Sequence, residues 1–260
     1  MKKKCEEKLK ELTGKNYIVF TRRGNSSILA SLKLMKELGF QKVIIQEQGG
    51  WITYPQFIER LKFECERIIT DYGIIKGIED NDAVLLCNSM PGYFALQNMS
   101  EVSNFASEKK LFLINDVSGS IGTEEAKIGD LIIGSFGRWK PLNVEEGGFI
   151  ATNDEEHYNY FKEFEEKINF EKLHQKLSNL KSKLEKFDEI SSKIKTDLSD
   201  FHIIHKDLKG INVIARFISD EEKEKLIKYC NEKNYTFVEC PKYIRVLDDA
   251  ISIEVKRLDL

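Results

Sequence analysis

The chain has 260 residues, of which 41% are hydrophobic and 32% charged, a balance typical of a soluble globular protein with a sizeable core. Its 40 basic and 43 acidic residues are mixed along the chain and give a net charge of −3, so no broad basic surface for nucleic acid or anionic lipid is indicated. No apolar run approaches the roughly 20 residues of a membrane helix, and the charged start is unlike a secretory signal. Five scattered cysteines without a CxxC pair predict a cytoplasmic protein with reduced thiols and no metal site.

The first 152 residues alternate short apolar runs with amphipathic segments. The apolar runs predict strands at residues 17–21, 42–46, 83–87, 111–114, 130–133 and 149–152. Helical spacing predicts helices at residues 5–12, 26–38, 55–64 and 96–108. This rhythm is typical of an α/β protein with a mostly parallel central sheet covered by helices. In such sheets ligands bind at the carboxyl ends of the strands, so the residues that follow each strand are the candidates for a site.

The rest of the chain has a different pattern. Residues 155–200 lack proline and glycine and carry apolar residues at spacings of three and four, which predicts one long helix or two in series. Next come a predicted strand at 210–217, a helix at 220–233 capped by Ser219, and strands at 235–238, 243–246 and 250–255. We therefore expect a large domain at residues 1–153, a helical connector at 154–205 and a small C-terminal α+β domain at 206–260.

A possible phosphate-binding turn follows the first predicted strand. Gly24, Asn25 and Ser26 lie at the start of a predicted helix, where backbone N–H groups and hydroxyls can bind an anion. The segment contains neither GxGxxG nor GxxxxGK[ST], so it does not support a dinucleotide or ATP site. Taken alone, it also fits a plain helix start with Ser26 as the N-cap and Gly24 as a turn residue.

Two further predicted strands are followed by residues that could bind a ligand or take part in a reaction. Asp116 follows the strand at 111–114, and a carboxylate buried there requires a cationic or protonated partner, such as the ring nitrogen of a ligand. The alternative is a surface turn aspartate. Ser135 and Lys140 follow the strand at 130–133. We expect Lys140 to be partly desolvated by Trp139 and Pro141, which lowers its pKa and makes it a usable amine nucleophile.

The order of these groups matches the needs of pyridoxal 5′-phosphate (PLP): an anion cradle for its phosphate, a carboxylate for its ring nitrogen and an amine for its aldehyde. The sequence resembles the fold-type I PLP enzymes, specifically the DegT-type sugar aminotransferase family. The family's lysine segment, approximately S-F-H-x-x-K-x-L-x-x-G-E-G-G, corresponds to SFGRWKPLNVEEGG at residues 135–148. Its E-D-A-A-Q-A-x-G corresponds to NDVSGSIG at 115–122, its S-G-T-x-A-L to RGNSSI at 23–28, and its T-F-x-A-T to WITY at 51–54.

The resemblance implies a large PLP-binding domain, PLP as the cofactor and a role for each matching residue. Lys140 would form the Schiff base with PLP and carry the proton at the substrate's α-carbon. Asp116 would pair with the pyridinium nitrogen, and Trp51 would stack on the ring. The residues that would hold the phosphate are Gly24, Asn25, Ser26 and Ser135. The implied reaction is aminotransfer on a small amino or keto substrate, including one linked to a sugar, in a homodimer with active sites at the subunit interface.

Two positions depart from the family pattern. Gly119 stands where the family has glutamine, and Gly137 stands where it has histidine. In addition, the chain after Gly148 is shorter than we expect for the family. A PLP-dependent lyase and a non-catalytic or regulatory protein with the PLP fold therefore stay open as alternatives. Arg216 and Arg245 could bind a substrate carboxylate, but we favour a structural or surface role for both.

Overall fold

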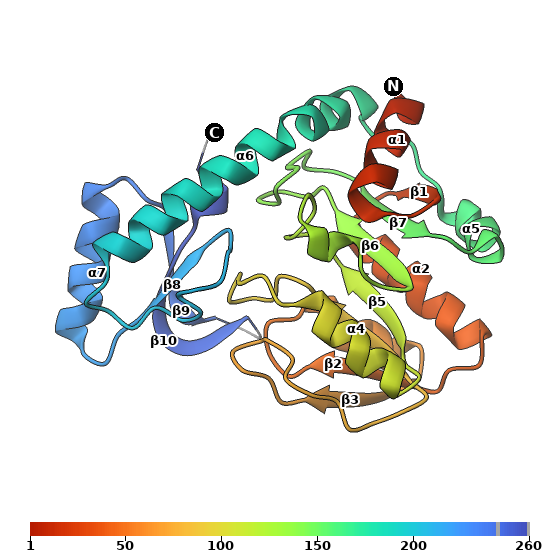
Figure 1. The fold of residues 1–260 in the computed structure, drawn as a ribbon, viewed down its shortest axis with the longest axis horizontal. Helices are drawn as coiled ribbons and strands as arrows, with labels where there is room; N and C mark the ends of the chain where they lie inside the picture. The colour runs from red at the N-terminus through yellow and green to blue at the C-terminus, as the bar shows by residue number, and fades with distance from the viewer. Residues whose placement is uncertain (243–244, 259–260) are drawn as a thin grey trace.

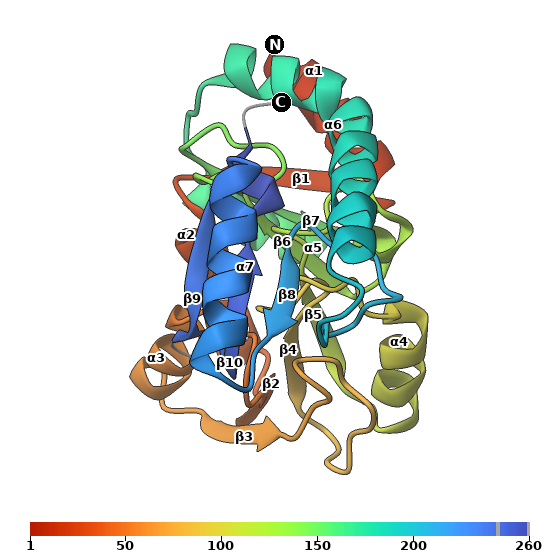
Figure 2. The ribbon, with the colours of Figure 1, turned by 90° about the vertical axis from the view of Figure 1, so that its left-hand side faces the viewer.

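The computed structural model describes residues 1–242 and 245–258. A large helix-covered sheet and a smaller sheet lie side by side, and the long helix α6 (Phe170–Asp197) runs past both (Figure 1). None of the helices in these residues is long and apolar enough to cross a membrane. The turned view shows α7 (Asp220–Glu232) in front of the small sheet (Figure 2).

The central sheet has seven strands in the order β1-β7-β6-β5-β4-β2-β3. They are β1 (Tyr17–Thr21), β2 (Lys42–Gln46), β3 (Glu64–Ile68), β4 (Val84–Asn88), β5 (Phe112–Asp116), β6 (Leu131–Ser135) and β7 (Gly148–Thr152). The strands from β3 to β6 in this order are parallel, whereas β7 is antiparallel to both β6 and β1. The expected mostly parallel α/β sheet is therefore confirmed.

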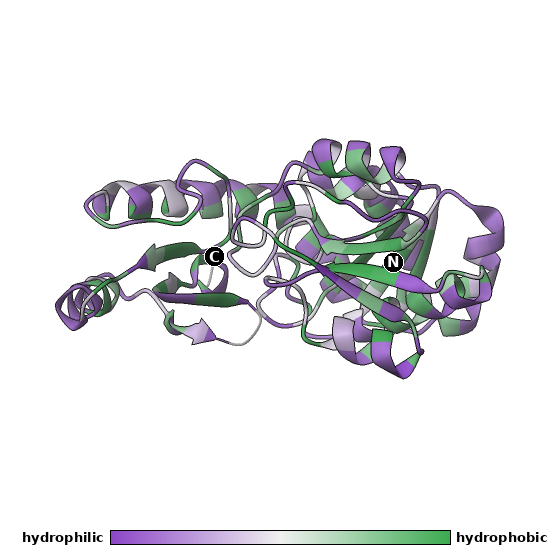
Figure 3. Cartoon of the chain, turned by 90° about the horizontal axis from the view of Figure 1, so that it is seen from below, coloured by the Kyte–Doolittle hydropathy of each residue, from purple (hydrophilic) through white to green (hydrophobic). Residues whose placement is uncertain are grey.

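Helices cover both faces of this sheet. The remaining helices are α1 (Lys2–Thr13), α2 (Gly24–Glu37), α3 (Thr53–Arg60), α4 (Met99–Glu108) and α5 (Glu155–Phe161). One face packs Leu131 and Ile133 against α2, α3 and α5, and the other packs the intervening Ile132 against α1 and α6, while α4 covers the same second face farther along. The inner strands are accordingly apolar along most of their length, while the helices mix apolar and polar residues (Figure 3).

The structure corrects one predicted helix and selects between two readings of another segment. The helix predicted at residues 55–64 ends at Arg60, and Glu64 begins β3. This strand lies at the sheet edge with mostly polar side chains, so it is held by backbone pairing with β2 and has no apolar pattern to reveal it. Residues 155–200 form two helices in series, because a 3₁₀ turn at Lys162–Phe164 follows α5 before α6 begins.

The small sheet is antiparallel, in the order β8-β10-β9. Its strands are β8 (Val213–Arg216), β9 (Phe237–Lys242) and β10 (Val246–Ile253). Ser219 caps α7 as predicted, since its Oγ accepts a hydrogen bond from Glu222 N at 3.3 Å. Of the strand predicted at residues 243–246, Tyr243 and Ile244 lie outside the described residues, and Val246 begins β10.

Helix α6 joins the two sheets through one continuous apolar stripe. Leu173 and Leu177 belong to the core beneath the central sheet, whereas Phe187 and Ile194 pack in the core of the small sheet. A 28-residue helix is about 42 Å long, enough to reach both cores. The helix therefore fixes the small sheet opposite the carboxyl ends of the central strands, where the cavities described below lie.

Candidate active site

The parallel strands β4, β5 and β6 end side by side at Asn88, Asp116 and Ser135. A cavity of about 300 Å³ lies at this edge of the sheet. The sequence-predicted residues that line it are Gly24, Asn25, Trp51, Asp116, Ser135 and Lys140. Ser26 lies in the first turn of α2 but does not line the cavity. The structure thus brings these residues together from four separate segments of the chain.

The N-terminus of α2 forms one wall of this cavity. The helix begins at Gly24 with Arg23 as its N-cap, so the alternative reading of Ser26 as the N-cap is wrong. No side chain caps this helix start, which leaves N–H groups and the positive end of the helix dipole facing the cavity. A Cβ on Gly24 would lie 2.6 Å from the Cβ of Ser135, so only glycine lets the helix approach this hydroxyl so closely.

Asp116 is a buried carboxylate with hydrogen bonds but no cation. The residue is 4% exposed, and its Oδ2 accepts a hydrogen bond from Tyr54 Oη at 2.6 Å while its Oδ1 accepts one from Ser118 N at 2.9 Å. Among residues 1–242 and 245–258, no basic side chain lies within ion-pair distance of it. Each carboxylate oxygen retains a lone pair for a further donor. A buried carboxylate in this state favours a positively charged partner from the cavity.

Tyr54 is a site residue that the sequence did not reveal, because its partner Asp116 is 62 residues away in the chain. Burial, reinforced by Asp116, raises the pKa of Tyr54 well above its ordinary value, so the phenol stays a neutral donor.

We expect Tyr54→Phe to lower the free energy of unfolding by about 1–3 kcal/mol, since Asp116 loses a donor. Urea unfolding measures this, with Tyr160→Phe as the control, because the Tyr160 hydroxyl contacts Glu37 on the surface. Equal losses in both variants would contradict the assignment.

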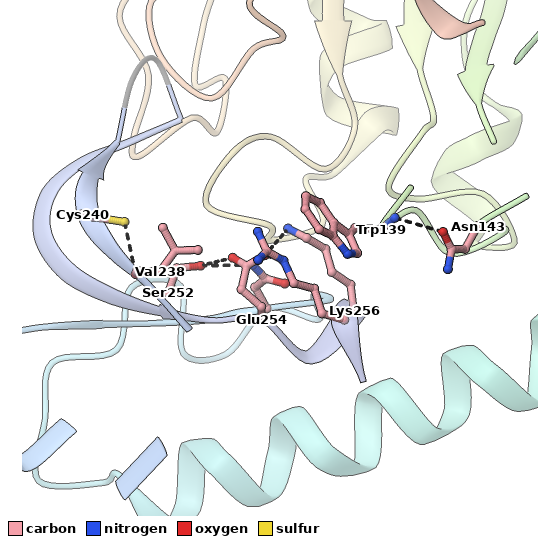
Figure 4. Close-up of polar contacts among 9 residues, drawn as sticks. Trp139, Asn143, Val238, Cys240, Ser252, Glu254 and Lys256 are labelled. Atoms are coloured by element: carbon pink, nitrogen blue, oxygen red, sulfur yellow. Dashed lines mark hydrogen bonds and ion pairs between the residues drawn. The ribbon is translucent and has the colours of Figure 1, made fainter. Parts of the chain in front are cut away.

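Lys140 lies in a loop between β6 and β7 that folds back on itself. The backbone N–H groups of Val144 and Glu145 both donate to the Phe136 carbonyl, at 2.8 and 2.9 Å. Trp139 N donates to Asn143 Oδ1 at 3.1 Å, a contact drawn in Figure 4. These bonds close the turn and direct the Lys140 side chain into the cavity.

The amine of Lys140 is desolvated although the residue as a whole is half-buried. Burial lowers its pKa, the Arg245 charge lowers it further, and Asp116 opposes both. Its Nζ lies 5.0 Å from the centroid of the Trp51 ring. The ring is held in place because its Nε1 donates to Asn25 Oδ1 at 2.9 Å. The arrangement therefore presents an amine with an increased neutral fraction beside an aromatic wall and an anion cradle.

The two glycines that depart from the family pattern also lie at the site. A Cβ on Gly119 would lie 3.2 Å from the Cβ of Met90, so Met90 occupies space next to it. Gly137 N donates to Ser135 Oγ at 3.1 Å, and a Cβ there would meet the same oxygen at 3.1 Å. Neither position supplies a polar side chain to the cavity.

A second cavity, of about 280 Å³, adjoins the first, and Trp51 and Lys140 line both. It extends to the small sheet, where Arg245, Lys256 and Arg257 line it. From the sequence, Arg245 was a candidate carboxylate ligand for which a structural or surface role was favoured, whereas Lys256 and Arg257 were not singled out. The signal available was the charged run at residues 254–257 directly after an apolar strand, the same pattern that revealed Asp116. Arg216 does not line either cavity and pairs with Asp248 at 3.4 Å.

The model of the DegT/DnrJ/EryC1/StrS aminotransferase family matches residues 1–196. The chain belongs to this family. The match includes every residue that the resemblance singled out around the first cavity, and it confirms the family inferred from the lysine segment. A second model, the MJ1341 family C-terminal domain, matches residues 165–260 of this DegT-family chain. No curated protein matches the chain.

Solved structures similar to this DegT-family chain have the same fold. A DegT DnrJ EryC1 StrS aminotransferase from Brucella abortus is 14% identical with a TM-score of 0.76, covering 97% of this chain and 84% of that one. NtdA from Bacillus subtilis with bound cofactor PMP is 14% identical (TM-score 0.72; 97% and 72% covered). The E. coli GDP-4-keto-6-deoxy-D-mannose-3-dehydratase with bound hydrated PLP is 13% identical (TM-score 0.74; 96% and 86% covered). This chain is thus a shorter member with the fold of these PLP enzymes.

Within its described residues, no three His, Cys, Asp or Glu side chains are grouped to hold a metal ion.

Proposed function

We propose that this protein is a PLP-dependent, aminotransferase-like enzyme in which Lys140 forms the Schiff base with the cofactor. The observation that carries the proposal is that two groups, a carboxylate and an amine, face the same cavity. Asp116 is buried without a cation, and the desolvated amine of Lys140 faces the same space. Each group is costly to bury alone, and PLP satisfies both, with a ring nitrogen for the carboxylate and an aldehyde for the amine.

The residues present fit PLP in the remaining contacts. The uncapped N-terminus of α2 supplies N–H groups at Gly24 and Asn25 for the phosphate, and Ser135 adds a hydroxyl, whereas Ser26 does not line the cavity. Trp51, held by Asn25, supplies an aromatic face for the ring. When bound, PLP supplies an electron sink for the bonds at the substrate's α-carbon.

Lys140 is the residue we assign to proton transfer. Its lowered pKa increases the fraction of neutral amine near neutral pH, so it can accept the proton from the substrate's α-carbon and return one. Asp116 lies near enough to oppose this lowering, so the amine can still be protonated during turnover. The loop bonds that hold residues 136–145 keep the amine at the cavity.

We propose a small amino or keto compound, including one linked to a sugar, as the substrate. Membership of an aminotransferase family supports this, as does the fold shared with the GDP-4-keto-6-deoxy-D-mannose-3-dehydratase. The test is to add PLP, reduce with borohydride and locate the adduct by peptide mass spectrometry, with Lys140 as the expected site. A panel of amino acids is then added to unreduced protein, and conversion of the cofactor spectrum to the pyridoxamine form is expected. PLP bound to Lys140 that no amino acid changes would instead support a non-catalytic protein.

We also propose that the protein works as a homodimer in the cytoplasm. The resemblance to the DegT family implies active sites at a subunit interface, and this supports the homodimer. Light scattering after size-exclusion chromatography should give twice the 30.1 kDa mass of the chain. A single-chain mass at working concentrations contradicts the homodimer.

A further inference from the structure

The second cavity contains a cluster of positive charge that the proposed chemistry at Lys140 does not use. Arg245, Lys256 and Arg257, from the segment around and after β10, line the same wall. The guanidinium carbon of Arg245 lies 4.8 Å from the centroid of the Trp51 ring, and that of Arg257 lies 4.0 Å from the centroid of Trp139. The two aromatic rings thus hold the two guanidinium groups at the cavity.

Lys256 is the most buried member of this cluster. It is 7% exposed, and its Nζ lies 3.2 Å from the centroid of the Phe94 ring. The same Nζ is 3.2 Å from Glu254 Oε2, yet it makes no hydrogen bond of good geometry, and neither does the Nε of Arg257 at 2.9 Å from that oxygen. Figure 4 shows Glu254, Lys256 and Trp139 gathered at this point. A buried ammonium with unused donors, lining a cavity, fits a ligand that accepts hydrogen bonds.

The charges in this cluster do not balance. Glu254 is the carboxylate that faces the cations, and one of its oxygens is already engaged, because Oε1 accepts from Asn212 Nδ2 at 2.6 Å and from Ser252 Oγ at 2.8 Å. Two guanidinium groups therefore face one carboxylate before Lys256 is counted. An excess of positive charge that lines a cavity is stabilised by an anion bound there.

We propose that the second cavity binds an anionic oxygen group of the substrate, a carboxylate or a phosphate, between Arg245, Lys256 and Arg257. The enzyme would then act on an acidic amino or keto compound, whose anionic end lies at the small sheet and whose reacting carbon lies at Lys140. This inference rests on the proposed function, because Lys140 lines both cavities. Guanidinium groups suit either anion, since both offer two oxygens in the geometry of their N–H donors.

Proton linkage to Lys256 gives the proposal a distinct signature. Burial lowers the pKa of Lys256 to about 7, with Lys140 and Arg245 lowering it and Glu254 raising it. An anion favours the protonated amine, so binding raises this pKa, and affinity is fully present below it. As pH rises from about 7 the affinity should fall by up to about tenfold per pH unit. Lys256→Met should remove this dependence.

The protein's tryptophans report on the cluster directly. The sequence has two tryptophans, Trp51 and Trp139, and each lies under one of the cavity's guanidinium groups. PLP-loaded protein is titrated with succinate and, separately, with inorganic phosphate, while tryptophan fluorescence is followed. We expect a saturable change, with the tighter anion identifying the substrate's acidic group. The pH series uses succinate, which stays fully ionised above neutral pH.

Variants separate this site from other anion binding. Arg257→Gln and Arg245→Gln should each weaken the tighter anion by about tenfold or more, whereas Arg216→Gln, which removes a small-sheet arginine outside the cavity, should leave it unchanged. No saturable change with either anion, or equal weakening in Arg257→Gln and Arg216→Gln, would overturn the anion site. PLP attached to Lys140 without anion binding overturns this inference alone. Anion binding that depends on Arg257, in a protein that does not attach PLP, overturns the proposed function instead.

Discussion

Replacing Lys140 with Ala should abolish covalent attachment of PLP and reduce turnover by about 10²–10⁴-fold, the range that a positioned acid–base group contributes. Both losses would have one cause, since the amine that lines both cavities is the group proposed to form the bond and to move the proton. Borohydride reduction followed by intact-mass measurement detects attachment, and steady-state kinetics with the best amino donor from the panel measures turnover.

A matched control separates this effect from general loss of a lysine. Lys228 lies on the exposed side of α7 and pairs with Glu232 at 3.8 Å, so Lys228→Ala should keep both attachment and turnover. Thermal unfolding should show that Lys140→Ala is still folded, because among residues 1–242 and 245–258 its Nζ has no hydrogen-bond partner and lies 5.0 Å from the Trp51 ring centroid. A borohydride-reducible chromophore fully retained in Lys140→Ala would exclude Lys140 as the attachment site.

The central sheet could be predicted from sequence because its strands are buried on both faces. The strand predicted at residues 17–21 and that at 42–46 coincide with β1 and β2, since runs of apolar β-branched residues have few other stable places in a globular protein. The edge strand β3 was missed because its side chains are mostly polar and exposed, whereas β1, which also lies at a sheet edge, is apolar and buried. The apolar pattern of the sequence therefore predicts strands that are stabilised by side-chain packing. It does not predict a strand that is stabilised mainly by backbone hydrogen bonds to its neighbour.

The residues of the candidate site differ in the same way in how far the sequence indicates them. Asp116 and Lys140, whose roles are proposed above, could be singled out because each follows a recognisable strand, and the topology of a parallel sheet brings such ends to one edge. Tyr54 and Lys256 were missed because their roles depend on contacts across the fold, 62 residues apart for Tyr54 and Asp116. The approach of Lys256 to the Phe94 ring likewise depends on how α6 places the small sheet, which no local spacing encodes.

Replacing Asp116 with Asn should slow proton abstraction from an amino donor by about 10²–10³-fold while leaving the protein folded. The amide keeps the size of the carboxylate and can still accept from Tyr54 or Ser118 N, but it cannot keep a pyridine nitrogen protonated. Stopped-flow absorbance of the PLP-loaded variant mixed with the amino donor measures this step.

The control for this variant is another aspartate bound to the backbone. Asp130 lies at the opposite end of the same strands and accepts from Leu113 N at 2.8 Å, so Asp130→Asn should cost stability without slowing the chemical step. A cofactor analogue gives the sharper test. N-methylated PLP carries a permanent positive charge on its ring nitrogen, so it should restore much of the rate to Asp116→Asn if the carboxylate acts by holding that charge. If the analogue leaves the variant as slow as PLP does, Asp116 acts by positioning the ring, and its assignment as the partner of the ring charge is wrong.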